Sequence, residues 1–254
     1  MAGSATVPPL TSRNFASGKL KRETKADSRR CTCLHCARLL NKSVIFREFY
    51  QKRSRPVISF EVFPPKTDAA MQNLEQVLPE IVSLKPDFMT VTYGALGSTQ
   101  ERTLDIASTI QNRFKVPTAC HLTCVGSSKA DLDTILQRIR DAGIRNIVAL
   151  RGDPPAGETK FVAPKDGLGH ANELVDFIRA AEKSGRLGPV GIAVAGYPEK
   201  HVEAPDLKTD LANLKRKVDA GADCVVTQLF YDNRAYFDFV KAARDIGKIG
   251  RAHV

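Results

Sequence analysis

The sequence lacks any stretch of about 18 uncharged apolar residues, the least that a membrane-spanning helix needs. It also lacks the apolar segment that follows the basic start of a secretory signal. We therefore expect no membrane partner and a cytoplasmic location. With 254 residues, 43% of them hydrophobic, the chain has enough apolar material for one large domain or two small ones.

An excess of positive charge is absent from most of the chain, although the whole carries a formal net charge of +10. Residues 1–56 contain 13 Lys and Arg against 3 acidic residues, and 25 residues of each sign follow from residue 57 onward. This balance gives no support for nucleic-acid binding by the main part of the chain. Binding of a polyanion by the basic head is an alternative, and it predicts salt-sensitive binding that maps to residues 1–55.

Residues 1–55 are rich in Ser, Arg and Lys and show weak hydrophobic periodicity, with one short helix expected between Lys42 and Tyr50. We interpret them as a basic, disordered N-terminal extension. A segment foreign to the natural protein and a transit peptide are alternatives, the latter weakened by Glu23 and Asp27.

The sequence has no convincing metal-binding motif. Four candidate ligands fall within six residues, without a second pair at a distance, and this spacing would strain a tetrahedral zinc site: Cys31, Cys33, His35 and Cys36. We therefore predict no metal. The other cysteines lie in apolar runs and are expected to be small core residues: Cys120, Cys124 and Cys224.

From residue 56 onward, short apolar runs alternate with amphipathic segments about every 30 residues, a pattern typical of βα units. The predicted strands are 57–63, 88–93, 118–124, 146–150, 191–195 and 224–229. The predicted helices are 69–84, 103–113, 129–142, 171–183, 207–220 and 233–245.

Six consecutive βα units fit either an open doubly wound sheet or an eight-stranded barrel. The first strand is not followed by the G-x-G-x-x-G sequence of a dinucleotide-binding sheet. Instead, polar residues occur where strand after strand ends, and a barrel places its active site at that rim. We favour an incomplete (β/α)8 TIM barrel over residues 56–248, with about six of eight units present.

Seven segments in this region resemble successive blocks of the methylenetetrahydrofolate reductase family. They occur in the family's order and extend from residue 57 to about 248: 59–65, 91–95, 121–124, 148–153, 195–199 with His201, 213–221 and 227–228. The resemblance implies a flavoenzyme in which NADH or NADPH reduces FAD, which in turn reduces 5,10-methylenetetrahydrofolate to 5-methyltetrahydrofolate by ping-pong kinetics. It also implies a homo-oligomer when the chain is full length.

Two carboxylates match the family's catalytic positions. Glu61, flanked by Phe60, Val62 and Phe63, is expected to be a general acid whose pKa is raised by burial. A Glu61 paired with a Lys or Arg is the alternative. Asp153 is expected to contact folate and to tune the flavin, and its alternative is an ion pair with Arg151.

The FAD site implied by the resemblance must be built from rim loops, which supply cations and hydrogen-bonding groups. Gln228 is expected to bind the pterin through its amide, or else to be structural. The charged run 215–217 alone would suggest a solvated helix face, and His121 or Tyr197 could be core residues. The cofactor-contacting positions implied are Thr92, Tyr93, Ala95, His121, Arg151, Gly152, Asp153, His170, Ala171, Tyr197, His201, Ala204, Asp210, Asn213, Arg216 and Lys217.

Near its end the sequence departs from the family, which continues into a seventh and an eighth strand. Residues 249–254 resemble a sequencing-adapter stretch read in frame, and we expect them to be a non-native tail of a C-terminally truncated copy. A non-enzymatic fragment with weak flavin binding is therefore an alternative. Since no signature of 2'-phosphate recognition is found, the choice between NADH and NADPH stays open, with a preference for NADH.

Overall fold

A computed structural model of the chain describes residues 44–51, 55–93, 98–154 and 161–246. All of these belong to the second of two compact units, Ser43–Val254. The expected disorder of residues 1–43, the cysteines at 31–36 and the expected tail at 249–254 lie outside the described residues.

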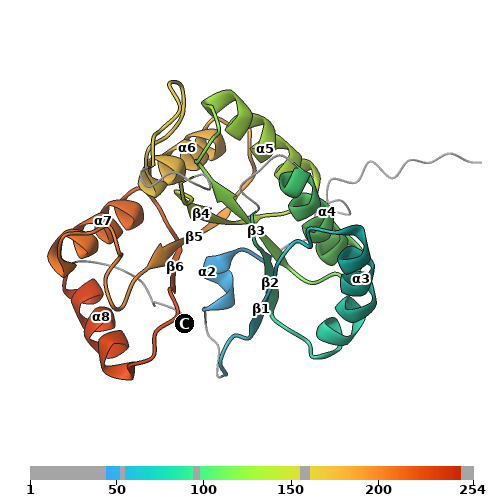
Figure 1. Cartoon of the computed structure of the whole chain (residues 1–254), viewed down its shortest axis with the longest axis horizontal. Coiled ribbons are helices and arrows are strands. Elements are labelled where there is room, and N and C mark those ends of the chain that lie inside the picture. Colours follow the sequence, from blue (N-terminus) through green and yellow to red (C-terminus); the bar gives the residue numbers. More distant parts are fainter. Residues whose placement is uncertain (1–43, 52–54, 94–97, 155–160, 247–254) are drawn as a thin grey trace, which may run out of the picture. The chain divides into compact units, whose positions relative to one another are not determined.

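The described residues form a curved parallel sheet with helices along its outer side (Figure 1). Its six strands are β1 (Ser59–Val62), β2 (Phe88–Val91), β3 (Thr118–Thr123), β4 (Asn146–Leu150), β5 (Gly191–Gly196) and β6 (Cys224–Thr227). The helices that follow them are α3 (Asp68–Ser83), α4 (Ser98–Asn112), α5 (Lys129–Asp141), α6 (Ala171–Lys183), α7 (Leu207–Asp219) and α8 (Asn233–Asp245).

The strands are hydrogen-bonded in sequence order, from β1 to β6. A doubly wound sheet reverses its strand order partway along, and this sheet does not. The prediction of an incomplete TIM barrel is therefore confirmed. Among the described residues β1 and β6 each pair with one neighbour, so the sheet has two open edges.

Alternate residues of each strand face opposite sides of the sheet. One set packs against the outer helices and forms the main core, which includes Val62, Met89, Leu122, Ile147 and Val194. The other set faces the barrel interior, so the rim of the interior is lined by residues such as Glu61, Thr90 and His121.

A short helix, α2 (Phe46–Phe49), covers the interior at the amino ends of the strands. Phe46 and Phe49 are buried, and their ring centroids lie 5.4 and 5.0 Å from that of Phe88. They pack with Ala119, Val148, Ala193 and Cys224 from four further strands.

The predicted short helix near 42–50 is therefore present, but the assignment of all residues up to 55 to a disordered extension needs correction. Residues 44–51 belong to the folded domain, whose predicted start at 56 is too late. A single helical turn is too short to give a periodic signal, and its burial depends on strands about 40 to 180 residues away.

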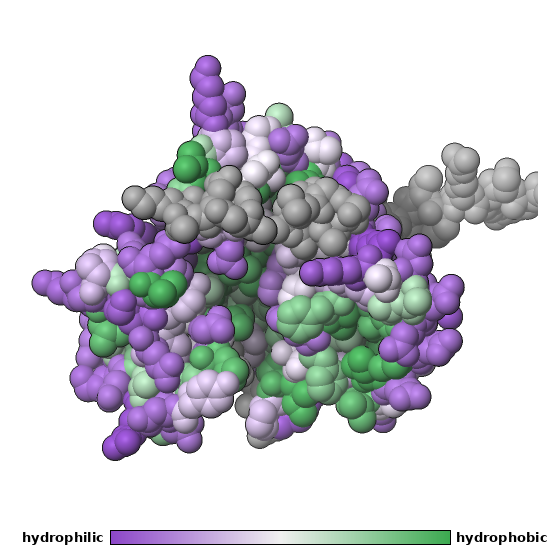
Figure 2. Space-filling view, viewed as in Figure 1, coloured by the Kyte–Doolittle hydropathy of each residue, from purple (hydrophilic) through white to green (hydrophobic). Residues whose placement is uncertain are grey.

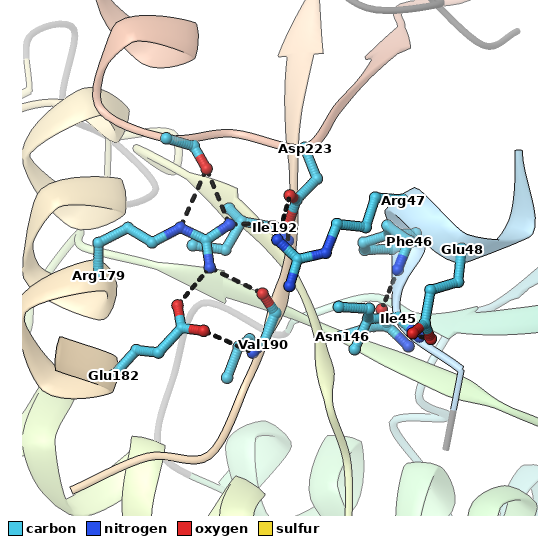
Figure 3. Close-up of polar contacts among 11 residues, drawn as sticks. Ile45, Phe46, Arg47, Glu48, Asn146, Arg179, Glu182, Val190, Ile192 and Asp223 are labelled. Atoms are coloured by element: carbon cyan, nitrogen blue, oxygen red, sulfur yellow. Dashed lines mark hydrogen bonds and ion pairs between the residues drawn. The ribbon is translucent and has the colours of Figure 1, made fainter. Parts of the chain in front are cut away.

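Polar contacts at the amino ends join α2 to β4, and α6 to the starts of β5 and β6 (Figure 3). The buried Asn146 accepts a hydrogen bond from Phe46 N at 2.7 Å and donates one to Val44 O at 2.8 Å. Asp223 pairs with Arg179 at 2.8 Å and accepts a hydrogen bond from Ile192 N at 2.8 Å. We interpret these contacts as stabilising the fold, because a barrel performs its chemistry at the opposite end of its strands.

Space-filling shows hydrophobic side chains along a hollow between the side of the domain that carries α7 and α8 and the side that carries α3 (Figure 2). Large apolar side chains are exposed near both sheet edges, with Phe63 at 69% and Val226 at 42%. No helix in the described part of the chain is long and apolar enough to cross a membrane.

Candidate active site at the carboxyl ends of the strands

A cavity of about 620 Å³ lies at the carboxyl ends of β4, β5 and β6. Thirteen of the residues singled out from the sequence line it: Arg151, Gly152, Asp153, His170, Ala171, Tyr197, His201, Ala204, Asp210, Asn213, Arg216, Lys217 and Gln228. The loops after three strands, the start of α6 and one face along α7 thus bring together residues up to 77 positions apart.

Gly152 shapes the entrance to this cavity. Its φ of +89° lies in the region that favours glycine, and an added Cβ would sit 2.5 Å from Val125 Cγ1. Glycine therefore allows the backbone after β4 to turn while packed against Val125, which places Arg151 and Asp153 at the cavity wall.

Arg151 pairs with a residue that the sequence analysis did not single out. Its Nη1 and Nη2 lie 2.5 and 2.7 Å from the two carboxylate oxygens of Glu203, and its Nε donates to Gly152 O at 3.1 Å. The guanidinium also lies over the Phe161 ring, 5.0 Å from its centroid. The alternative of an Arg151–Asp153 ion pair is not what the structure shows, and Asp153 forms no ion pair with another described residue.

Lys217 is the most buried cation of the cavity. Its Nζ donates to Ala195 O at 2.6 Å and lies 5.7 Å from the Tyr197 ring centroid. Burial lowers the pKa of Lys217 to about 8, an effect that the nearby Asp210 opposes. The residues of the 215–217 run therefore differ: Lys217 points inward, while Lys215 pairs with Asp219 on the solvated side of α7.

Asp210 and Asn213 stand one turn apart on α7. Asp210 is buried and accepts a hydrogen bond from His201 N at 3.0 Å, while Asn213 accepts one from Arg216 Nη1 at 2.9 Å. His201 stacks edge-on against Tyr197, with 4.6 Å between ring centroids. These contacts fix the loop after β5 against the start of α7.

Glu61 forms a second cluster, on β1 to β3 and outside the large cavity. Its Oε2 lies 3.4 Å from His121 Nε2 and 3.3 Å from Thr90 Oγ1. Hydrogen bonding to His121 lowers the pKa of Glu61, with burial acting in the opposite direction.

The expectation of a raised pKa at Glu61 is therefore wrong for this structure. The apolar neighbours that were expected to desolvate the carboxyl point elsewhere. Phe60 and Val62 face the helices, Phe63 is exposed, and Glu61 itself has a side chain 44% exposed. Nor does Glu61 pair with a Lys or Arg of the described part of the chain, since its charged partner is His121.

The remaining predicted contacts are more scattered. Tyr93 packs on the helix side of the sheet, where its hydroxyl is buried and finds no hydrogen-bonding partner among the described residues. Thr92 O accepts from Thr103 Oγ1, and Ala95 lies outside the described residues. His170 precedes α6 and its Nδ1 lies 3.0 Å from Glu173.

Sequence reasoning missed several residues of the cavity wall, including Asn172, Glu173, Glu203 and Pro205. Position was the available signal, because each lies within three residues of one that was named. Within the described ranges, no group of three His, Cys, Asp or Glu side chains is arranged to hold a metal ion.

A parallel barrel sheet with a polar cavity at the carboxyl ends of its strands defines the class of barrel proteins that bind small molecules at that rim. The chain belongs to the methylenetetrahydrofolate reductase family, whose model matches residues 46–250. This confirms the resemblance described from the sequence.

Curated relatives agree with this assignment. Methylenetetrahydrofolate reductase (NADH) 1 of Arabidopsis thaliana is 47% identical over 205 residues, 77% of this chain and 34% of the relative. The 5,10-methylenetetrahydrofolate reductase of Salmonella typhimurium is 42% identical over 183 residues, 72% of this chain and 57% of the relative. The chain therefore spans between a third and three fifths of these relatives.

Solved structures with low sequence identity share the fold. One, an uncharacterized Clostridium thermocellum protein described as binding two copies of 5-methyl-5,6,7,8-tetrahydrofolic acid, has a TM-score of 0.51 and 16% identity, covering 79% of this chain and 65% of that one. A 2,3-dimethylmalate lyase has a TM-score of 0.55 and 12% identity, covering 77% of this chain and 66% of that one.

Proposed function

We propose that this chain performs flavin-dependent reduction of 5,10-methylenetetrahydrofolate to 5-methyltetrahydrofolate with NADH or NADPH as the hydride donor. Family membership supports the reaction class. The observation that carries the proposal is the cavity at the ends of β4 to β6, in which thirteen residues expected to bind cofactor or folate come together.

The residues of this cavity fit FAD. Its volume of about 620 Å³ lies within the 300 to 1,000 Å³ common for ligand sites. Lys217 and Arg216 supply positive charge suited to a pyrophosphate, and Asn213 offers a side-chain amide from the same helix. Gly152 also lines the cavity, and an added Cβ would collide with Val125, so the backbone reaches the wall there without a side chain.

When bound, FAD accepts hydride from the nicotinamide and passes it to the folate carbon. The chain's own groups then have distinct tasks. Asp153, exposed at the cavity wall, places a negative charge beside the ligand, and Gln228 offers a donor and an acceptor to the pterin. Glu61 supplies the proton that the departing folate nitrogen needs.

The absorption spectrum of the purified chain tests this proposal. The wild type is expected to purify with a flavin absorbance band that bleaches under anaerobic NADH and returns when 5,10-methylenetetrahydrofolate is added. Lys217→Ala should lose the band, because the inward-facing cation of the cavity is removed.

Lys215→Ala is the matched control, since Lys215 is two residues away on α7 and pairs with Asp219 at 2.6 Å outside the cavity. It should keep the wild-type spectrum. A wild-type chain that binds no added FAD would refute the proposal at its cofactor.

The open edges of the sheet favour a second candidate, a chain that binds flavin weakly and does not turn over. Large apolar side chains beside these edges are exposed, because no further strand of the described residues covers them. This candidate predicts a flavin band without bleaching by NADH or NADPH, so the same experiment separates the two.

A further inference from the structure

We propose that His121 is a positioning residue for Glu61, and that the pair rather than an isolated carboxyl delivers the proton in the reductase reaction. The inference rests on the proposed function and assigns to His121 a role beyond cofactor contact. It is based on the contacts among three side chains on adjacent strands, Glu61 on β1, Thr90 on β2 and His121 on β3.

The strand register brings the three side chains of the cluster to one face. Glu61 on β1 is paired with Thr90 on β2, and Thr90 is paired with Ala119 on β3. His121 lies two residues beyond Ala119 and therefore faces the same side, the barrel interior. Its imidazole meets the carboxylate because of this alternation and the parallel register.

The two partners differ in exposure. The side chain of His121 is 15% exposed and that of Glu61 is 44% exposed. The imidazole thus lies on the protein side of the carboxylate, while the carboxylate keeps a free face at the rim. A ligand at the rim can therefore contact Glu61 while the Glu61 carboxylate keeps its contact with His121 on the opposite side.

Few other ionisable groups can compete for the proton. Among the described residues, the side chains that contact the Glu61 carboxylate from the neighbouring strands are His121 and Thr90, the latter through its hydroxyl. A small cavity of about 20 Å³ lies next to His121, and its lining includes Tyr93, Cys120 and Arg138 of α5. Burial raises the pKa values of Tyr93 and Cys120, so neither gives up its own proton near neutral pH.

In the resting pair the shared proton is on the imidazole, and hydrogen bonding to His121 keeps the pKa of Glu61 low. When folate is bound at the rim, this proton moves from His121 Nε2 to Glu61 Oε2 and from there to the folate nitrogen. The bond between that nitrogen and the methylene carbon breaks with its electron pair going to the nitrogen, and the carbon, held as an iminium by the second folate nitrogen, takes the hydride. Glu61 is left as a carboxylate and His121 as a neutral imidazole, which takes up one proton from the buffered solvent to restore the pair.

A titration of the Glu61 carboxyl tests the pair without flavin. The chain is labelled with carboxyl-13C glutamate and titrated by NMR. The signal that disappears in Glu61→Gln is assigned to Glu61, and its titration is then compared between wild type and His121→Asn. Removal of the imidazole should raise the Glu61 pKa by about one unit or more. His170→Asn, which removes an exposed imidazole elsewhere on the rim, should leave it unchanged. An unchanged Glu61 titration in His121→Asn would overturn the inference.

The two half-reactions give a second readout. In His121→Asn, reoxidation of reduced flavin by 5,10-methylenetetrahydrofolate should slow by about tenfold or more, because only this step needs the proton. Bleaching by NADH should stay within about twofold of wild type, a split that general structural damage would not give. Equal slowing of both steps would show that His121 acts on the flavin instead. If wild type binds no flavin, the reductase proposal fails, and the carboxyl titration still decides whether the pair exists.

Discussion

Replacing Asn146 with Ala should release α2 from the amino end of the barrel. Asn146 is 1% exposed and makes two hydrogen bonds to the backbone of residues about 100 positions away, one with Phe46 N and one with Val44 O. The substitution would leave the buried Phe46 amide without its acceptor and remove the donor to Val44 O, which is partly reached by water.

The magnitude follows from these two groups. An unsatisfied buried polar group costs about 1 to 3 kcal/mol, and a lost hydrogen bond at a wetter position about 1 kcal/mol, so Asn146→Ala should lower the free energy of unfolding by about 2 to 4 kcal/mol. Urea denaturation of the full chain measures this change, provided that the m value is unaltered. Amide hydrogen exchange at residues 44–50 should accelerate in the variant, because α2 opens before the sheet does.

Asn112→Ala is the control. Asn112 is exposed, and its Nδ2 donates to Ala142 O at 2.9 Å, a comparable bond in water. Its loss should change stability by about 0.5 kcal/mol or less. If Asn146→Ala is as small in effect as Asn112→Ala, the argument that Asn146 holds α2 in place is wrong.

Three further outcomes are expected. Gly152→Ala should cost about 1 to 3 kcal/mol in urea denaturation, because φ is +89° and the new Cβ meets Val125, whereas Gly188→Ala, with open space around it, should be near neutral. Arg179→Met should cost about 3 kcal/mol by the same assay, since it leaves the carboxylate of Asp223, 10% exposed, without its main partner. Lys217 should add to stability between about pH 8 and 10.5, where the unfolded chain binds its proton and the folded chain does not, whereas the cysteines whose pKa burial raises act in the opposite direction: Cys120, Cys124 and Cys224. In a series of denaturation curves, the free energy of unfolding of wild type should therefore increase relative to that of Lys217→Met across this range.

The sequence predicted the order and type of the main elements because their signals are local. Hydrophobic periodicity and helix ends placed 146–150, 171–183 and 233–245 at the observed bounds, and the other elements of the sheet and its outer helices within a few residues, apart from the start of α4. Since the carboxyl ends of parallel barrel strands share one rim, polar residues at those ends predicted the place of the cavity and its wall at Arg151, Asp153 and Gln228. The residues contributed by α6 and α7 were implied only by the family resemblance.

The tertiary structure decided matters that depend on which distant groups meet. The direction of the Glu61 pKa shift follows from strand alternation and from His121, 60 residues away, and not from the apolar neighbours in the sequence. Arg151 finds Glu203 rather than Asp153, its near neighbour in the chain. From the sequence alone, residues 44–51 are grouped with the basic N-terminal segment. In the structure they belong to the folded domain, because Phe46 and Phe49 pack in the interior of the barrel. A local pattern reports the conformation of a segment, whereas charge pairing and burial are set by contacts that exist only once the strands are in register.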